Sequence, residues 1–356
     1  MKRRFSISGL IFTLIAAISI AIVFNSNPLI ILSVLIMASF IPTPSGVSFM
    51  ALQKEIWEKD IVDNLYKDND FAKVCWNADQ YVLAGKVVHI PVAGAAAQVK
   101  KNLTAFPQVA VNRTDSEIVY IIDTYYALPR QIQNIEKWEL SYDKRQSVVG
   151  EDEKQLIQSA MEGLLYNWAP PASNVVLTTG ADSALDLIDG TATGTRKVFT
   201  KTEFKAIAKK MANANLANTR RVGLLTANHY HQFFESLSDA EKTNFFAVAD
   251  LKRGVIGMYM GIEIMMRSTV LRYRQVAGVW TVIDTQDPAF AATAADSAAS
   301  LFWSEMCVER AKGDINVFDN PGQALYYGDV FSANLRLGGR IRRLVGVYAI
   351  VEDPTA

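Results

Sequence analysis

Hydrophobic side chains recur along this chain at spacings that predict a mixture of helices and strands. Apolar residues return at helical spacing over 51–66 and predict an amphipathic helix. The longest helical pattern runs from 141 to 168 and stops at the proline pair 170–171, because proline cannot continue a helix. Another helix is predicted directly after Thr200 and Glu203, which have the spacing of a capping box.

Strand patterns occupy most of the remaining chain. β-Branched and aromatic residues with intervening turn residues predict a long β-hairpin over 85–130. Further strands are predicted over 221–226, 254–269 and 332–351. By contrast, 172–197 is rich in Gly, Thr, Ser and Asp and is predicted to be a loop, whereas 301–310 fits a strand or a helix.

The amino-terminal segment 1–49 differs from everything after it. Residues 5–53 contain no charged side chain, and the run 5–24 has about the 20 apolar residues that a membrane span needs. Three interpretations compete: a signal anchor, a cleaved signal peptide, or a segment that is not part of the mature protein. The break at 42–46 and the charged helix that follows it favour the last, so we expect the mature chain to begin at Met50 or Ala51.

Composition narrows the class without identifying it. The 36 basic and 36 acidic side chains cancel, which argues against a protein whose main task is to bind nucleic acid tightly. The length of 356 residues is enough for two or three packed lobes. Cys75 and Cys307 are expected to be buried free thiols, because both lie among apolar residues far apart in the sequence.

A search for catalytic motifs finds little. His229 and His231 could share one face of a strand and bind a metal, but no third ligand lies near them, and packing within a helix is favoured. The glycines of 254–261 do not match a dinucleotide-binding motif. We therefore expect no enzyme, no cofactor and no metal site.

The order of elements resembles that of tailed-phage major capsid proteins. An amphipathic arm, a long basic hairpin, one long helix, a mixed lobe and closing strands follow one another over 50–352. Several stretches are similar to capsid proteins of Bacteroides phages, including crAss-like phages: 50–57, 64–67, 85–91, 115–126, 139–147, 162–168, 254–268, 327–332, 338–339 and 346–351. The segment 1–49 departs from that family.

The resemblance implies an α+β fold of the Hong Kong 97-like type, with peripheral and axial domains. It implies these boundaries: apolar segment 1–49, amino-terminal arm 50–84, extended hairpin loop 85–130, peripheral domain with the long spine helix 131–194, axial domain 195–252, and remaining strands of both domains 253–356. The function it implies is structural. Copies would assemble as hexamers and pentamers into the icosahedral head around double-stranded DNA, without sequence-specific binding.

The same resemblance suggests partners and contact residues. Scaffold and portal proteins are expected partners, in the host cytoplasm during assembly and then in the virion, and 50–356 is expected not to associate stably with membranes. Assembly contacts are predicted at Lys100, Lys101, Arg113, Arg130, Trp57 and Ile61. Two other classes stay open: a membrane-anchored surface or periplasmic protein, and an encapsulin-like nanocompartment shell.

Overall fold

The structure is a computed structural model in which a defined set of residues can be described. These are 69–83, 86–92, 101–102, 116–133, 144–184, 193–216, 218–250 and 253–354. All of them lie in one of the two units into which the chain divides, Trp57–Ala356. The predicted helix over 51–66 and the apolar segment 1–49 lie outside them.

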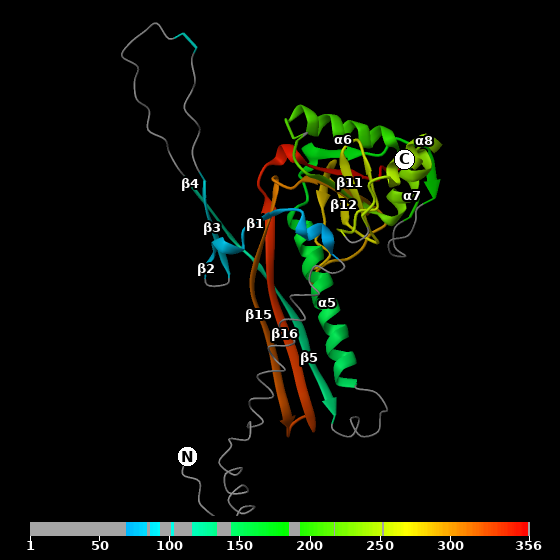
Figure 1. The fold of residues 1–356 in the computed structure, drawn as a ribbon. Helices are drawn as coiled ribbons and strands as arrows, with labels where there is room; N and C mark the ends of the chain where they lie inside the picture. Colours follow the sequence, from blue (N-terminus) through cyan, green and yellow to red (C-terminus); the bar gives the residue numbers. More distant parts are fainter. Residues whose placement is uncertain are drawn as a thin grey trace, which may run out of the picture. The chain divides into compact units, whose positions relative to one another are not determined.

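A four-stranded sheet contains the three longest strands of the described residues. Its order is β1-β15-β16-β5, with β1 (Trp76–Asn77), β15 (Val308–Gln323), β16 (Gly328–Ile341) and β5 (Asp123–Gln133) (Figure 1). Helix α5 (Lys144–Asn167) packs on β5 and β16 through Leu156, Ala160 and Leu164, spaced four residues apart. The long helix expected over 141–168 is thus confirmed within the described residues.

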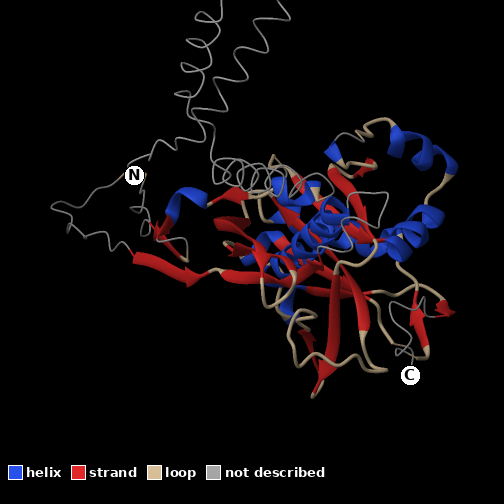
Figure 2. Ribbon diagram, turned by 90° about the horizontal axis from the view of Figure 1, so that it is seen from below, coloured by secondary structure: helices blue, strands red, loops and turns tan. Residues whose placement is uncertain are grey.

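The second large sheet has eight strands. Its strands are β6 (Val175–Leu177), β9 (Arg221–Thr226), β10 (Gly257–Tyr259), β11 (Ile262–Arg267), β12 (Leu271–Val276), β13 (Val279–Val282), β14 (Ser297–Ser304) and β17 (Val347–Val351). Every residue of β9, β14 and β17 is buried, so these strands are the centre of the sheet. Figure 2 shows the same strands and helices from a perpendicular direction.

Three helices share an aromatic core with this sheet. They are α6 (Lys201–Asn213), α7 (Ala227–Ser236) and α8 (Asp239–Phe246). The capping box expected at Thr200 and Glu203 is present, because the Glu203 carboxylate accepts a bond from the Thr200 N–H at 2.9 Å. Phe204 and Phe233 stack with ring centroids 4.9 Å apart in the middle of this core.

The small sheets are local. Strands β2 (Val82–Leu83), β3 (Val87–Val92) and β4 (Ser116–Ile121) form one, and β7 (Asp182–Ala184) and β8 (Thr195–Lys197) form the other. Four 3₁₀ turns complete the described elements: η1 (Asp70–Lys73), η2 (Asp79–Tyr81), η3 (Ala172–Asn174) and η5 (Leu344–Gly346). None of the helices among the described residues is long and apolar enough to cross a bilayer.

The structure corrects two expectations and decides a third that the sequence left open. Among the described residues of 85–130, hairpin pairing joins β3 to β4, whereas β5 belongs to the four-stranded sheet as the partner of β16, so 85–130 is not one hairpin. The expected loop 172–197 contains the strand β6. This strand pairs with β17 in parallel, and Val175 lies opposite Ala349. In the ambiguous stretch 301–310, residues 301–304 belong to β14 and 308–310 to β15, with a turn at 305–307.

Candidate assembly surfaces and pockets

The β3–β4 hairpin has a small hydrophobic base. Its register runs from Val87 opposite Ile121 to Val92 opposite Ser116. The buried residues at this base are Ala78, Val88, Ile90, Ile122 and Ala311. The base of the hairpin is therefore tied to the main body by this core, and the opposite end of the pair leads to the segment 93–115, of which residues 101–102 are described.

A buried carboxylate lies where the hairpin base meets the four-stranded sheet. Glu309 on β15 has no exposed surface, and its oxygens lie 2.6 Å from Arg340 Nε and 3.3 Å from Arg342 Nε. The Arg342 guanidinium lies 4.1 Å from the centroid of the Trp76 ring. Burial, and secondarily the Glu309 charge, raise the pKa of Tyr120 on β4. This cluster joins β1, β4, β15 and β16.

The predicted contact residues are only partly within the described structure. Lys101 is exposed. Arg130 lies on β5 opposite Phe331, and its Nε is 3.3 Å from Asp152 Oδ1 while the side chain stays 64% exposed. Arg130 is therefore separated from the paired part of the hairpin. Lys100, Arg113, Trp57 and Ile61 lie outside the described residues.

An acidic groove runs between β5 and α5. Its volume is about 810 Å³, and four of its five charged lining residues are aspartates: Asp123, Asp152, Asp284, Asp287 and, as the one cation, Arg130. Burial, then the charges of Asp123 and Asp284, raise the pKa of Tyr125 in its wall. A groove with this charge suits a basic partner.

Large apolar side chains are exposed beside this groove and at the β15–β16 turn. Tyr126 and Leu128 on β5 are 70% and 81% exposed. At the turn, Leu325 and Tyr327 are 85% and 82% exposed, with Tyr326 between them. Clustered exposed apolar residues mark surfaces that contact other chains.

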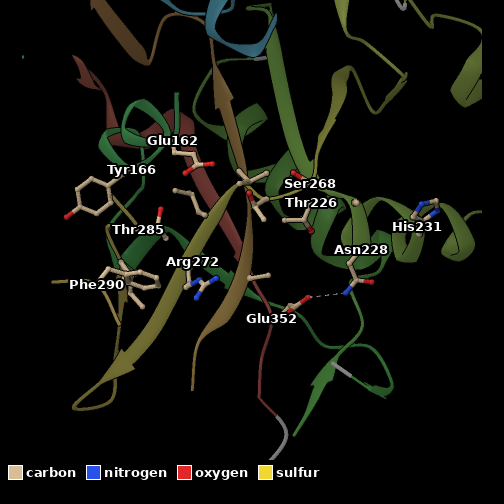
Figure 3. Close-up of a pocket in the computed structure, with 16 residues that line it drawn as sticks. Glu162, Tyr166, Thr226, Asn228, His231, Ser268, Arg272, Thr285, Phe290 and Glu352 are labelled. Atoms are coloured by element: carbon tan, nitrogen blue, oxygen red, sulfur yellow. Dashed lines mark hydrogen bonds between the residues drawn. The ribbon is translucent and has the colours of Figure 1, made fainter. Parts of the chain in front are cut away.

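A second cavity, of about 620 Å³, lies between α5, the start of α7 and the carboxyl-terminal segment (Figure 3). Glu162 and Tyr166 contribute from α5, and Glu352 contributes from the residues after β17. Arg272 stacks at 5.2 Å over the ring of Phe290, so the cavity's main cation already has an aromatic partner.

Beside this cavity, His229 takes part in a buried polar chain that the sequence did not reveal. Its Nδ1 lies 2.7 Å from Ser300 Oγ, which also accepts a bond from the Thr226 N–H. Its Nε2 lies 3.2 Å from Glu352 Oε1, near enough for electrostatic attraction but not aligned for a hydrogen bond. Ser300 and His229 have no exposed surface. These polar contacts hold α7 against β14 and the carboxyl-terminal segment. Because Ser300 is fully buried, its hydroxyl is not accessible to a substrate.

The expected packing of His229 within a helix is confirmed. The side chains that it contacts, Ser300 and Glu352, lie 71 and more residues away in the sequence, so no local pattern predicted them. His231 does not join it, since it lines the cavity from another side of α7. Both cysteines are buried and free, and burial raises the pKa of Cys75 to about 12. Among the residues that the structure describes, no group of His, Cys, Asp and Glu is arranged to hold a metal ion.

Comparison of the fold with solved structures finds phage shells. The capsid of cyanophage P-SCSP1u matches with a TM-score of 0.54 and 15% identity, over 79% of this chain and 87% of that one. The capsid of Ralstonia phage GP4 matches with a TM-score of 0.54 and 13% identity, over 80% and 88%. This chain has an α+β capsid fold.

A third capsid-fold match is the head structure of Helicobacter pylori bacteriophage KHP40. It has a TM-score of 0.50 and 9% identity, over 81% of this chain and 91% of that one. No protein-family model and no curated protein matches the sequence. The capsid fold is therefore shared at sequence identities too low to carry residue roles across.

Proposed function

We propose that this protein is the major capsid protein of a tailed phage, and that many copies form the icosahedral head that encloses the double-stranded DNA genome. The observation that carries the proposal is the capsid fold, which covers about four fifths of this chain in each of three phage shells. Exposed apolar side chains on β5 and at the β15–β16 turn support it, because a shell subunit is buried on several sides by its neighbours.

The proposal assigns roles to the elements. The β3–β4 hairpin and the chain between its strands form the extended loop, and α5 is the spine of a peripheral domain together with β5, β15 and β16. Helices α6 to α8 and the eight-stranded sheet form most of the axial domain. The arm 50–84 and the apolar segment 1–49 keep the roles expected from the sequence. Closeness to crAss-like phages, the Hong Kong 97-like subtype, and scaffold and portal partners belong to the same proposal.

Contacts between copies follow from charge. The segment 93–115 carries Lys100, Lys101 and Arg113, and the strands that lead into it, β3 and β4, are anchored at their base in a small core. The acidic groove between β5 and α5 offers complementary charge to a basic segment from another copy. The same proposal expects the protein in the virion, after assembly in the host cytoplasm.

Sedimentation velocity of the purified full chain, alone and with a scaffold protein, tests this function. A shell subunit gives fast-sedimenting closed particles or capsomers whose amount rises with protein concentration. A protein that stays monomeric at every concentration, with and without scaffold, would contradict the proposal.

A further inference from the structure

Helix α6 carries charge of a single sign on its exposed side. Its buried positions are Glu203, Phe204, Ile207, Ala208 and Met211. The exposed charged residues are Lys205, Lys209 and Lys210, with the half-buried Lys201 at the start of the helix. The helix's only acid, Glu203, is buried and bonded to Thr179 and Thr200. In a chain with a formal net charge of zero, this is a concentrated basic surface.

Three of these lysines have no carboxylate partner among the described residues. Lys201 Nζ lies 3.1 Å from Glu241 Oε2, so its charge is already compensated. Lys210 Nζ lies 5.5 Å from the centroid of the Tyr348 ring, which does not neutralise it. No ion pair of Lys205 or Lys209 is formed within the described part of the chain. We call Lys205, Lys209 and Lys210 the lysine row.

Helix stability explains only part of this arrangement. A cation in the last turn is favoured by the helix dipole, which accounts for Lys209 and Lys210. Lys205 lies further from that end, and Lys205 and Lys209 are neighbours on one face, where like charges four residues apart repel weakly. A partner that supplies negative charge would remove this repulsion.

The composition of the surface indicates the kind of partner. The other exposed residues of α6 are small or polar: Thr202, Ala206, Ala212 and Asn213. The cores of protein–protein interfaces are rich in aromatic residues, Met and Arg and poor in Lys. Lys205 and Lys209 are about 6 Å apart along the axis of a rigid helix, and Lys210 follows directly, so three flexible, hydrated cations suit a polymer that carries closely spaced negative charges.

We propose that the lysine row binds the phosphate backbone of double-stranded DNA. The inference rests on the proposed function only for the source of that DNA, which is the enclosed genome. Contacts to phosphates by lysines carry no sequence information, so they hold any duplex equally well. A basic surface of this kind is compatible with a net charge of zero for the whole chain, because it occupies only one face of one helix.

Salt-dependent binding tests the proposal. We compare the full chain with the triple variant Lys205→Gln, Lys209→Gln and Lys210→Gln, measuring fluorescence anisotropy of a labelled DNA duplex at increasing NaCl concentration. Each lost phosphate contact reduces the magnitude of the slope of log K against log salt by about 0.9. The slope of the triple variant is therefore expected to be smaller in magnitude by up to about 3, and the variant is expected to bind the duplex more than about tenfold more weakly near 0.1 M salt. A control carries Lys86→Gln and Lys154→Gln, which remove charge from exposed lysines elsewhere that form no ion pair within the described part of the chain.

The control variant is expected to keep the wild-type slope. Equal loss in both variants would show an effect of net charge alone and would overturn the assignment, as would an unchanged slope in the α6 variant or no binding by the wild type. If the α6 variant keeps DNA binding but no longer forms particles, the surface contacts another copy and the proposal is wrong. Failure of the wild type to form particles would overturn the shell function instead, while leaving the difference in slope to decide the DNA site.

Discussion

Replacing Glu309 with Gln is expected to destabilise the fold strongly, because it removes a charge that is fully buried against two arginines. The side chain has no exposed surface, and Arg340 Nε at 2.6 Å makes a charge-assisted bond with it. Bonds to charged groups contribute about 1.5–3 kcal/mol, and breaking a buried ion pair costs about 3–5 kcal/mol. Arg340 and Arg342 are 26% and 29% exposed and can regain some water. We therefore expect a loss of about 2–3 kcal/mol.

A matched control lies on the same strand. Asp314 on β15 also faces an arginine of β16, with Oδ2 3.6 Å from Arg336 Nη1, but it is 61% exposed. An exposed pair contributes about 0–1 kcal/mol, so Asp314→Asn is expected to change stability by less than about 1 kcal/mol. The assay is urea unfolding of unassembled subunits at neutral pH, followed by tryptophan fluorescence. Equal midpoints for the two variants would refute the reasoning that burial decides the contribution.

Three further predictions use other contacts. Gly339→Ala should destabilise the fold by about 2–3 kcal/mol in the same urea assay, because a Cβ there would lie 2.4 Å from the Glu309 carbonyl oxygen. Gly150→Ala on α5, where a Cβ would meet nothing within 4 Å, should stabilise it by about 0.5–1 kcal/mol. The opposite order of the two variants would contradict the packing. Asp296→Asn should lower stability at pH 7 and flatten its loss on acidification. The Asp296 carboxyl is buried, which alone would raise its pKa, but Arg274 and Thr293 hold the pKa below its usual value, so its contribution is present above about pH 4 and disappears as pH falls towards the lowered pKa; an unchanged pH profile would exclude this role. Reversing Lys100, Lys101 and Arg113 to Glu should weaken assembly and leave the unfolding midpoint of the subunit unchanged, and a large drop in that midpoint would show that these residues belong to a core.

Local sequence patterns predicted many of the helices and strands. The proline pair at 170–171 and the apolar spacing located α5, and the capping residues Thr200 and Glu203 located the start of α6. Each of these signals acts within a few residues, so one sequence is enough to recognise it. Pairings between distant segments gave no such signal. Strand β6 is only three residues long, and nothing near it indicates that its partner is Ala349–Val351.

The candidate surfaces were less predictable than the elements. Four of the six contact residues chosen from the sequence were basic residues assigned to the hairpin, yet one of them, Arg130, lies on β5 in the four-stranded sheet, because the chain changes partner at Ile122. The acidic groove could not be predicted from the sequence, because its aspartates come from three separate segments, β5, α5 and 284–287. The link from His229 to Ser300 and Glu352 also depends on three elements meeting in space.

Electron microscopy of negatively stained particles tests the central claim most directly. The full chain and residues 50–356 are each produced with the scaffold protein, and the fast-sedimenting fraction is imaged. A major capsid protein gives closed, angular shells of uniform diameter built from hexamers and pentamers. Fields that contain only monomers or shapeless aggregates, from both chains and at every concentration tried, would contradict the assignment.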